Sequence, residues 1–154
     1  LVMTDVNTAL LAEVAARTNA EIVAPDAIYD VKADIYAPCA LGATLNPQTL
    51  DRLTVKAVVG AANNQLATPE IGQILFERGV LYAPDYVINA GGIISVATEY
   101  LARRDGRTGD IAEVNALVAQ IPGRLESIWQ ESESTGVSSD VVADRMAQKL
   151  IGRG

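Results

Sequence analysis

Short apolar segments alternate with helix-like segments through the first half of the chain, and this alternation constrains the fold most strongly. Strand-like segments are predicted at residues 1–4, 21–24, 33–38, 55–60 and 80–87. Helices or turns are predicted between them at residues 8–17, 47–53 and 68–79. Strands that are separated by helices form βαβ units, in which the sheet is parallel and the crossovers are right-handed. The sequence therefore predicts an α/β fold with a doubly wound parallel sheet and helices on both faces.

The second half of the chain has a different pattern, because helical segments follow one another without strands. Helices are predicted at residues 93–104, 110–134 and 140–151, with a break in the second one at Pro122-Gly123. This change divides the chain into residues 1–92 and a helical region, residues 93–154, that is expected to pack on them.

The glycine loop that is typical of dinucleotide-binding domains is missing from this sequence. Such domains carry G-x-G-x-x-G after their first strand, and an acid that binds the adenosine ribose follows about 20 residues later. Asp5 stands at the end of the first predicted strand, where that acid would lie. We therefore interpret residues 1–92 as a partial dinucleotide-binding domain that begins at the second strand of its sheet. The sheet is expected to show a gap or a rearrangement where the first strand is missing.

Charge and residue types exclude several classes of function. The net charge is −7, and an acidic chain is a poor ligand for nucleic acid or an anionic membrane surface. The chain has no histidine, which excludes Ser-His-Asp and Cys-His catalysis and the common histidine zinc sites within it, so no metal is expected. A single cysteine and no apolar run near the ~20 residues of a membrane span fit a reducing compartment. Since no basic segment marks a signal peptide, we expect a cytoplasmic protein.

Asp5 has two interpretations. A carboxylate at the end of a strand could accept both ribose hydroxyls and repel a 2′-phosphate, which would select NAD over NADP. Alternatively, Thr4-Asp5-Val6-Asn7 only caps the following helix. On local sequence alone the cap is favoured, because an Asp at a strand end is a weak signal.

Two segments of small and polar residues follow the next predicted strands, at the edge where open α/β sheets bind ligands. Residues 37–42 carry Cys39, which could be a reactive thiol or, more commonly for a lone cysteine, a small packed residue. Residues 60–65 carry Asn63, Asn64 and Gln65, whose paired amides could hydrogen-bond a carboxamide or a hydroxyl; alternatively the segment is a turn, because Asn tolerates left-handed conformations.

The last predicted strand runs into a helix through residues 85–92. Asn89 could pair with an amide, and Gly91-Gly92 would permit unusual dihedral angles and a close ligand. The alternative is a simple strand-to-helix turn. No general acid or base stands out in these segments, which favours a cofactor-binding domain over a complete active site.

Several long, irregular stretches of sequence carry a more specific signal. They are TDVN (4–7), DIYAPCALG (34–42), AANNQL (61–66), LYAPDYVINAGG (81–92) and VVADRMAQ (141–148). In order and spacing these stretches resemble the leucine, phenylalanine and valine dehydrogenases, and the resemblance covers essentially the whole chain. It implies a Rossmann-like doubly wound sheet that lacks its first strand and glycine loop, followed by C-terminal helices.

The resemblance also implies an activity. Enzymes of this family use NAD to deaminate an L-amino acid oxidatively to a 2-oxo acid, and they form oligomers. The chain would supply the NAD-binding part of such an enzyme, a homo-oligomer acting on a branched-chain or aromatic amino acid. The catalytic lysines and aspartate of the family lie in an N-terminal domain, so no catalytic residue is expected in this sequence.

Individual residues receive roles from the same resemblance. The implied cofactor-binding residues are Asp5, Cys39, Ala40, Leu41, Asn64, Asn89, Gly91 and Gly92. Ile93 and Val96 match positions of the substrate side-chain pocket, and their branched aliphatic side chains favour leucine or valine over phenylalanine. Ala43 stands where relatives often have a glycine.

Two other functions stay open. The sequence could form a truncated, non-catalytic module that binds a nucleotide or a partner, or an enzyme of another class with the same fold. The DNA upstream of Leu1 would distinguish a fragment of a longer enzyme from a truncated module. A reading frame that continues into a glycine loop and a lysine-bearing domain would identify the fragment.

Overall fold

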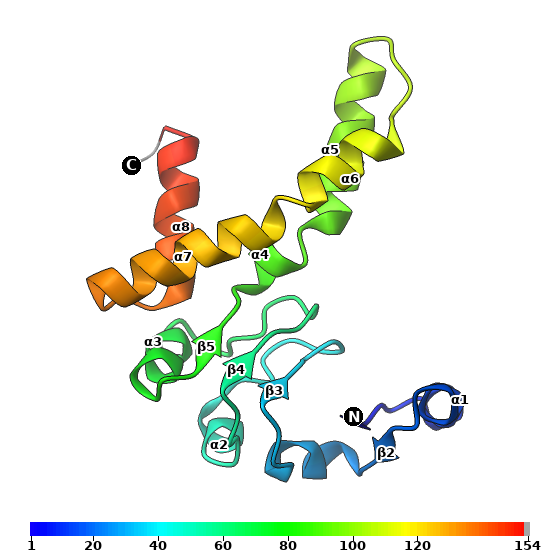
Figure 1. The fold of residues 1–154 in the computed structure, drawn as a ribbon, viewed down its shortest axis with the longest axis vertical. Coiled ribbons are helices and arrows are strands. Elements are labelled where there is room, and N and C mark those ends of the chain that lie inside the picture. Colours follow the sequence, from blue (N-terminus) through cyan, green and yellow to red (C-terminus); the bar gives the residue numbers. More distant parts are fainter. Residues whose placement is uncertain (153–154) are drawn as a thin grey trace.

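The computed structural model describes residues 1–152, and its strands form two separate parallel sheets (Figure 1). The first sheet contains β1 (Val2–Met3) and β2 (Glu21–Ile22). The second sheet has the order β3 (Ile35–Tyr36), β4 (Ala57–Val58) and β5 (Leu81–Tyr82). No pairing joins β1 to β3 in the described residues, so the predicted interruption of the sheet is confirmed.

Helical segments connect the strands, as the alternating pattern predicts. They are α1 (Thr8–Thr18), the 3-10 helix η1 (Pro25–Asp30), α2 (Pro47–Leu50) and α3 (Glu70–Glu77). The side chain of Asn7 caps α1 by accepting the Leu10 N–H at 3.1 Å, which satisfies one of the free donors at a helix start. Asn19 ends this helix in the left-handed conformation, with φ 53°.

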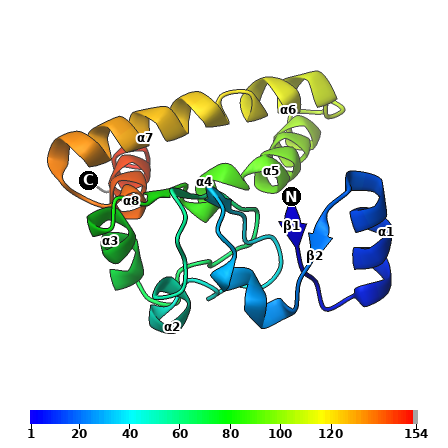
Figure 2. The ribbon, with the colours of Figure 1, turned by 60° about the horizontal axis from the view of Figure 1, so that its bottom comes forward.

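The three-stranded sheet has a hydrophobic core on each face. Val58 and Tyr82 belong to a core with α2 and α3, whereas their neighbours Val59 and Ala83 pack in a second core with the C-terminal helices. Successive residues of a strand point to opposite faces, which explains this division. Helices therefore cover both faces, as predicted, and Figure 2 shows α7 on the side of the chain away from α2.

The C-terminal part is helical from residue 85 onward. Its helices are α4 (Asp85–Ile88), α5 (Gly91–Arg104), α6 (Ile111–Val118), α7 (Ile121–Thr135) and α8 (Ser139–Leu150). α5 and α6 pack on each other and project from the rest of the chain (Figure 1). α7 and α8 pack on the sheet through Leu125, Ile128 and Val142, each at most 5% exposed.

Two predictions about element boundaries were wrong. The strand predicted at 80–87 ends at Tyr82, and α4 begins at Asp85, because Pro84 fixes its own φ and favours a helix start after it. The long helix was expected to break at Pro122-Gly123, but the break lies at residues 119–120, between α6 and α7. Pro122 then stands in the first turn of α7, where its missing N–H leaves no hydrogen bond unmade.

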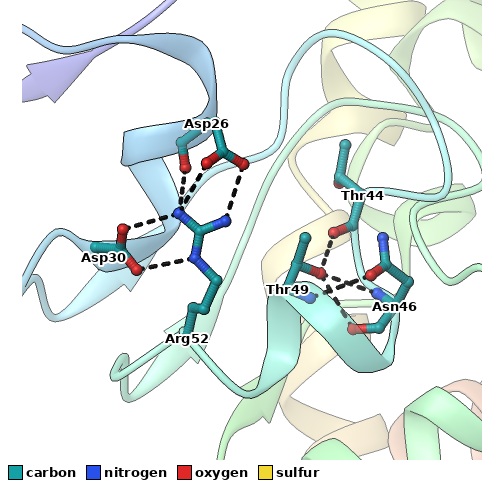
Figure 3. A network of polar contacts seen from close by, with 6 residues as sticks. All are labelled: Asp26, Asp30, Thr44, Asn46, Thr49 and Arg52. Atoms are coloured by element: carbon teal, nitrogen blue, oxygen red, sulfur yellow. Dashed lines mark hydrogen bonds and ion pairs between the residues drawn. The ribbon is translucent and has the colours of Figure 1, made fainter.

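Arg52 attaches η1 to the second sheet, and sequence patterning does not predict this contact. Its guanidinium donates to the carboxylates of Asp26 at 2.8 Å and of Asp30 at 2.8 and 2.9 Å (Figure 3). The guanidinium also lies 5.5 Å from the centre of the Tyr29 ring. The hydrogen bond from Arg52 holds the pKa of Asp30 below its usual value. Next to it, the side chains of Asn46 and Thr49 form a reciprocal capping box at the start of α2 (Figure 3).

Side chains close the outer edge of β5. The N–H groups of Leu81 and Ala83 donate to β4, so the backbone of Tyr82 faces the other way. There the carbonyl oxygen of Tyr82 accepts the indole N–H of Trp129 and the hydroxyl of Ser139, each at 2.8 Å. These donors take the place of a further strand and fasten α7 and α8 to the sheet.

Within the described part of the chain, no helix combines the length and apolar character needed to cross a bilayer. Residues 1–152 also contain no group of three or more acidic, cysteine or histidine side chains placed to hold a metal ion.

Candidate functional site

The segments that follow β3, β4 and β5 meet at the carboxyl edge of the three-stranded sheet. Backbone hydrogen bonds join the first two: the Ala43 N–H donates to the Asn64 carbonyl at 2.7 Å, and the Leu45 N–H donates to the Gln65 carbonyl at 3.0 Å. The Ala62 N–H also donates to the Pro38 carbonyl at 2.9 Å. Parallel strands present their carboxyl ends at one edge, and open α/β sheets bind ligands there.

Glycine is required where these two segments touch. A β-carbon on Gly60 would overlap the backbone of Pro38, and one on Gly42 would lie 2.7 Å from the carbonyl oxygen of Asn63. Ala43, at the position where relatives often have a glycine, adopts φ 56°. A non-glycine residue in this left-handed region costs about 1–2 kcal/mol. The backbone of this edge is therefore close-packed and partly strained.

Gln65 and Asp85 fix the loop that follows β4. The side chain of Gln65 is completely buried and donates to the carbonyls of Gly60 at 2.7 Å and Ala62 at 2.9 Å. The carboxylate of Asp85, at the start of α4, accepts the Gln65 N–H at 2.8 Å. Residues from two segments thus hold the 60–66 loop in one conformation. Sequence reasoning missed Asp85, although Pro84-Asp85 is a usual helix-start signal.

The residues predicted from the DIYAPCALG stretch lie at this edge and are open to solvent. Cys39, Ala40 and Leu41 are all exposed, and the Leu41 side chain is 76% exposed. Cys39 is a free cysteine. The alternative that Cys39 is a packed residue is therefore wrong.

Asn64 and Asn89 lie at the same edge. Asn64 is exposed and has φ 52°, so it does support a left-handed turn, and its side chain makes no hydrogen bond within residues 1–152. Asn89 follows α4 and is partly buried; its Nδ2 donates to the Ala61 carbonyl at 3.3 Å and to Oδ1 of Asn63 at 2.5 Å. The structure thus shows that Asn63, one of the amides noted in the 60–65 segment, is the partner of Asn89.

Asp5 lies apart from these residues, in the first sheet. Its carboxylate accepts the Asn7 N–H at 2.7 Å, and Asn7 rather than Asp5 caps α1. Asp5 is exposed, and within the described chain no hydrogen bond connects it to the edge of the second sheet. The cap interpretation is therefore correct for the segment 4–7 but not for Asp5 itself.

Gly91 and Gly92 do not use the conformational freedom of glycine. Both stand in the first turn of α5, and neither has a positive φ. A β-carbon on Gly92 would meet no atom within 4 Å. The expectation of unusual dihedral angles was wrong. Gly92 instead leaves open space beside the start of α5, whereas a β-carbon on Gly91 would contact the Val118 side chain at 3.9 Å.

Ile93 and Val96 follow on α5, with side chains that are 66% and 62% exposed. Ile93 lines an apolar groove of about 890 Å³ between α4–α5 and α7–α8, and Val96 is not among the groove residues. Tyr86 also lines this groove; burial, reinforced by the carboxylates of Asp144 and Asp140, raises its pKa to about 12. The Tyr86 hydroxyl is therefore a neutral donor at ordinary pH, and it bonds the Asp140 carbonyl at 3.0 Å.

The arrangement offers amide groups, exposed backbone and apolar side chains. Such a surface can bind and orient a ligand with polar and flat apolar parts. It presents no paired acid and base for proton transfer, so it suits cofactor orientation.

Comparison with known proteins places this geometry in a family. Residues 2–152 match the family model described as Glutamate/Leucine/Phenylalanine/Valine dehydrogenase. The chain belongs to this family. Its resemblance to the leucine, phenylalanine and valine dehydrogenases is thereby confirmed.

Individual members of the dehydrogenase family agree with this assignment. The chain is 43% identical over 151 residues to leucine dehydrogenase from Thermoactinomyces intermedius, and 37% identical over 156 residues to phenylalanine dehydrogenase from Bacillus thermotolerans. These alignments cover 98% of this chain, and 40% and 39% of the two enzymes. The crystal structure of L-tryptophan dehydrogenase from Nostoc punctiforme matches 99% of the chain with a TM-score of 0.90 and 38% identity, and 45% of that structure is covered. The sequence thus spans less than half of the length of these relatives.

Proposed function

We propose that this chain forms the NAD-binding part of an NAD-dependent L-amino acid dehydrogenase, which converts a branched-chain or aromatic amino acid to its 2-oxo acid. The observation that carries the proposal is the fixed edge of the second sheet, where exposed backbone and amide side chains stand beside an open helix start. Membership of the dehydrogenase family supports the reaction class.

The residues at this edge fit a nicotinamide dinucleotide. The exposed backbone of Cys39, Ala40 and Leu41 can border a nucleotide, and the space beside Gly91 and Gly92 admits a flat ring near α5. Asn64 and Asn89 both have amide oxygens without a hydrogen-bond partner in the described chain, and these can accept hydroxyl or amide hydrogens. Bound NAD would supply the chemistry by accepting a hydride from the α-carbon of the amino acid.

Asp5 would bind the adenosine ribose. Its carboxylate is exposed at the end of β1, and one oxygen is free of hydrogen bonds in the described chain. Carboxylate oxygens accept strong hydrogen bonds from hydroxyl groups, and a negative charge repels the 2′-phosphate of NADP. Asp5 would therefore select NAD.

Ile93 and Val96 would contact the side chain of the substrate. They are three positions apart on α5, so they lie on one face of the helix, and both are largely exposed. Their branched aliphatic surfaces favour leucine or valine over phenylalanine. The lysine-assisted chemistry of the reaction would come from elsewhere in a homo-oligomeric protein, because the loops described here contain no lysine.

The test is an assay of the full protein that contains this sequence, measuring NAD reduction with leucine, valine and phenylalanine offered separately. We expect turnover with NAD, and leucine or valine ahead of phenylalanine. Absence of NAD reduction with all of these amino acids would overturn the proposal and would favour a non-catalytic binding module.

Asp5→Ser tests the cofactor assignment. Loss of a hydrogen bond to a charged group costs about 1.5–3 kcal/mol, so KM for NAD should rise roughly 10- to 100-fold while the preference over NADP falls. Asp34→Ser is the matched control, because Asp34 is an exposed acid at the opposite end of a strand, before β3. Equal effects of both substitutions would contradict the role of Asp5.

A further inference from the structure

Asn63 and Asn89 come from different segments, and their side chains are hydrogen-bonded to each other at the candidate cofactor edge. Asn63 follows β4, whereas Asn89 stands 26 positions later at the end of α4. The backbone of Asn89 is held by its own N–H, which donates to the carbonyls of Asp85 and Val87. The backbone of Asn89 is therefore fixed, and Asn63 can influence only the rotation of the Asn89 side-chain amide.

The neighbours of Asn89 determine which way its amide faces. The Ala61 carbonyl can only accept, so the group that Asn89 turns toward it must be the Nδ2 amino group. The same amino group donates to Oδ1 of Asn63. Both hydrogens of Nδ2 are thus directed to protein acceptors, and Oδ1 of Asn89 is the atom left for a ligand.

The same reasoning orients Asn63. Because its Oδ1 accepts from Asn89, its Nδ2 points elsewhere, and in the described chain this Nδ2 donates to no protein acceptor. Asn89 therefore offers a free acceptor, and its hydrogen-bonded partner Asn63 offers a free donor. This pair is complementary to a primary carboxamide, which carries one donor group and one acceptor on the same carbon.

We propose that Asn63 has two roles: it holds the amide of Asn89 with its oxygen outward, and it donates to the cofactor itself, so that together the two residues make the site selective for a carboxamide-bearing cofactor ring. This inference rests on the proposed NAD-binding function. In it, Asn89 Oδ1 accepts the carboxamide N–H and Asn63 Nδ2 donates to the carboxamide oxygen. Without Asn63 the amino group of Asn89 keeps only the longer bond to the Ala61 carbonyl, at 3.3 Å, so the amide rotates more readily and distinguishes a donor from an acceptor less well.

The 3-acetylpyridine analogue of NAD provides the probe, because its ketone keeps the oxygen of the carboxamide but lacks the N–H₂ group. Dissociation constants of NAD and of this analogue are measured by calorimetry on the full protein that contains this sequence, without amino acid present. The wild type should bind NAD more tightly by roughly two- to tenfold, the effect of one neutral hydrogen bond. Asn63→Ala should weaken NAD binding and bring the ratio of the two dissociation constants close to one.

Asn63→Asp separates orientation from simple damage to the loop. Its carboxylate still accepts from Asn89 Nδ2, so the ratio should persist, while both dinucleotides bind less tightly because the donor to the carbonyl oxygen is gone. Gln73→Ala is the matched control, since Gln73 is an amide on α3 whose side chain bonds Glu77, away from the edge. The ratio of the two dissociation constants in this variant should equal that of the wild type.

A ratio that is unchanged in Asn63→Ala, or lost in Asn63→Asp, would overturn the positioning role. Failure of the wild-type protein to bind NAD at all would instead overturn the proposed function.

Discussion

The carbonyl oxygen of Tyr82 offers a quantitative test of how the C-terminal helices are attached to the sheet. It accepts hydrogen bonds from Trp129 Nε1 and Ser139 Oγ, and the Tyr82 residue is only 4% exposed. Ser139→Ala leaves the carbonyl with the Trp129 donor, so it should cost only the net value of one hydrogen bond, about 0.5–1.5 kcal/mol. Trp129→Phe should cost the same amount plus a term for the volume that it removes.

The double variant should cost more than the sum of the two single variants. With both donors absent, a buried carbonyl stays unsatisfied, which costs about 1–3 kcal/mol. The coupling free energy should therefore be about 1–2 kcal/mol, and the volume term of Trp129→Phe cancels in the double-mutant cycle. The assay is urea unfolding followed by far-ultraviolet circular dichroism, with Ser134→Ala as a control at an exposed position. Additive effects within about 0.3 kcal/mol would refute the reasoning.

Three further outcomes follow from contacts described above. Gly60→Ala should lower the free energy of unfolding by about 1–3 kcal/mol, because the added β-carbon would overlap the backbone of Pro38. An unchanged free energy of unfolding in urea would contradict this prediction. The depressed pKa of Asp30 gives stability that is present above its unfolded value of 3.8 and is lost as the pH falls through its lower folded value. In Arg52→Gln the free energy of unfolding should therefore fall less steeply as the pH is lowered. The same pH dependence in the variant and the wild type would argue against the ion pair. Partial burial raises the pKa of Tyr86 to about 12, so its contribution to stability is lost as the pH rises above 10.0. Because the pKa of Tyr36 is raised to about 12 as well, Tyr86→Phe should reduce by one tyrosine, without abolishing, the ultraviolet tyrosinate absorbance change near pH 12. A reduction of the change near pH 10 instead would contradict the raised pKa of Tyr86.

The periodic segments of the sequence predicted the fold correctly where local chemistry decides the structure. β4 (Ala57–Val58) lies inside the strand predicted at residues 55–60, a mostly apolar segment bounded by Gly60, and α1 carries its own cap in Asn7. α4 was missed because most residues of Leu81–Ile88 are apolar, and apolar content alone does not separate a strand from a short helix; Pro84-Asp85 was the local signal for the helix start. η1 was missed because what holds it is the contact with Arg52, 22 to 26 positions away.

The site shows the same limit. Residue types at strand ends predicted that Asn64 and Asn89 would reach one edge, since parallel strands end together. The bond between Asn63 and Asn89 could not be predicted, because it depends on how two loops turn in space and on which amide faces which. Asp5 was placed correctly at a strand end, and its separation from the second sheet agrees with the interruption that the missing first strand predicted.

The division into two sheets has a consequence for folding cooperativity. The hydrogen bonds described for residues 1–24 close within that segment, except that the Ala24 carbonyl accepts the Ala27 N–H of η1; the side-chain bonds of Arg52 to Asp26 and Asp30 then connect η1 to the part of the chain that forms the second sheet. Elements that share no core and few bonds open independently, at a lower free energy than the global transition. Amide hydrogens of β1 and β2 should then exchange with solvent well before those of β4, which has a paired strand on each side. The part of the chain that carries Asp5 is thus a separate unfolding unit, and a ligand that bridges Asp5 to the edge of the second sheet would couple the two units.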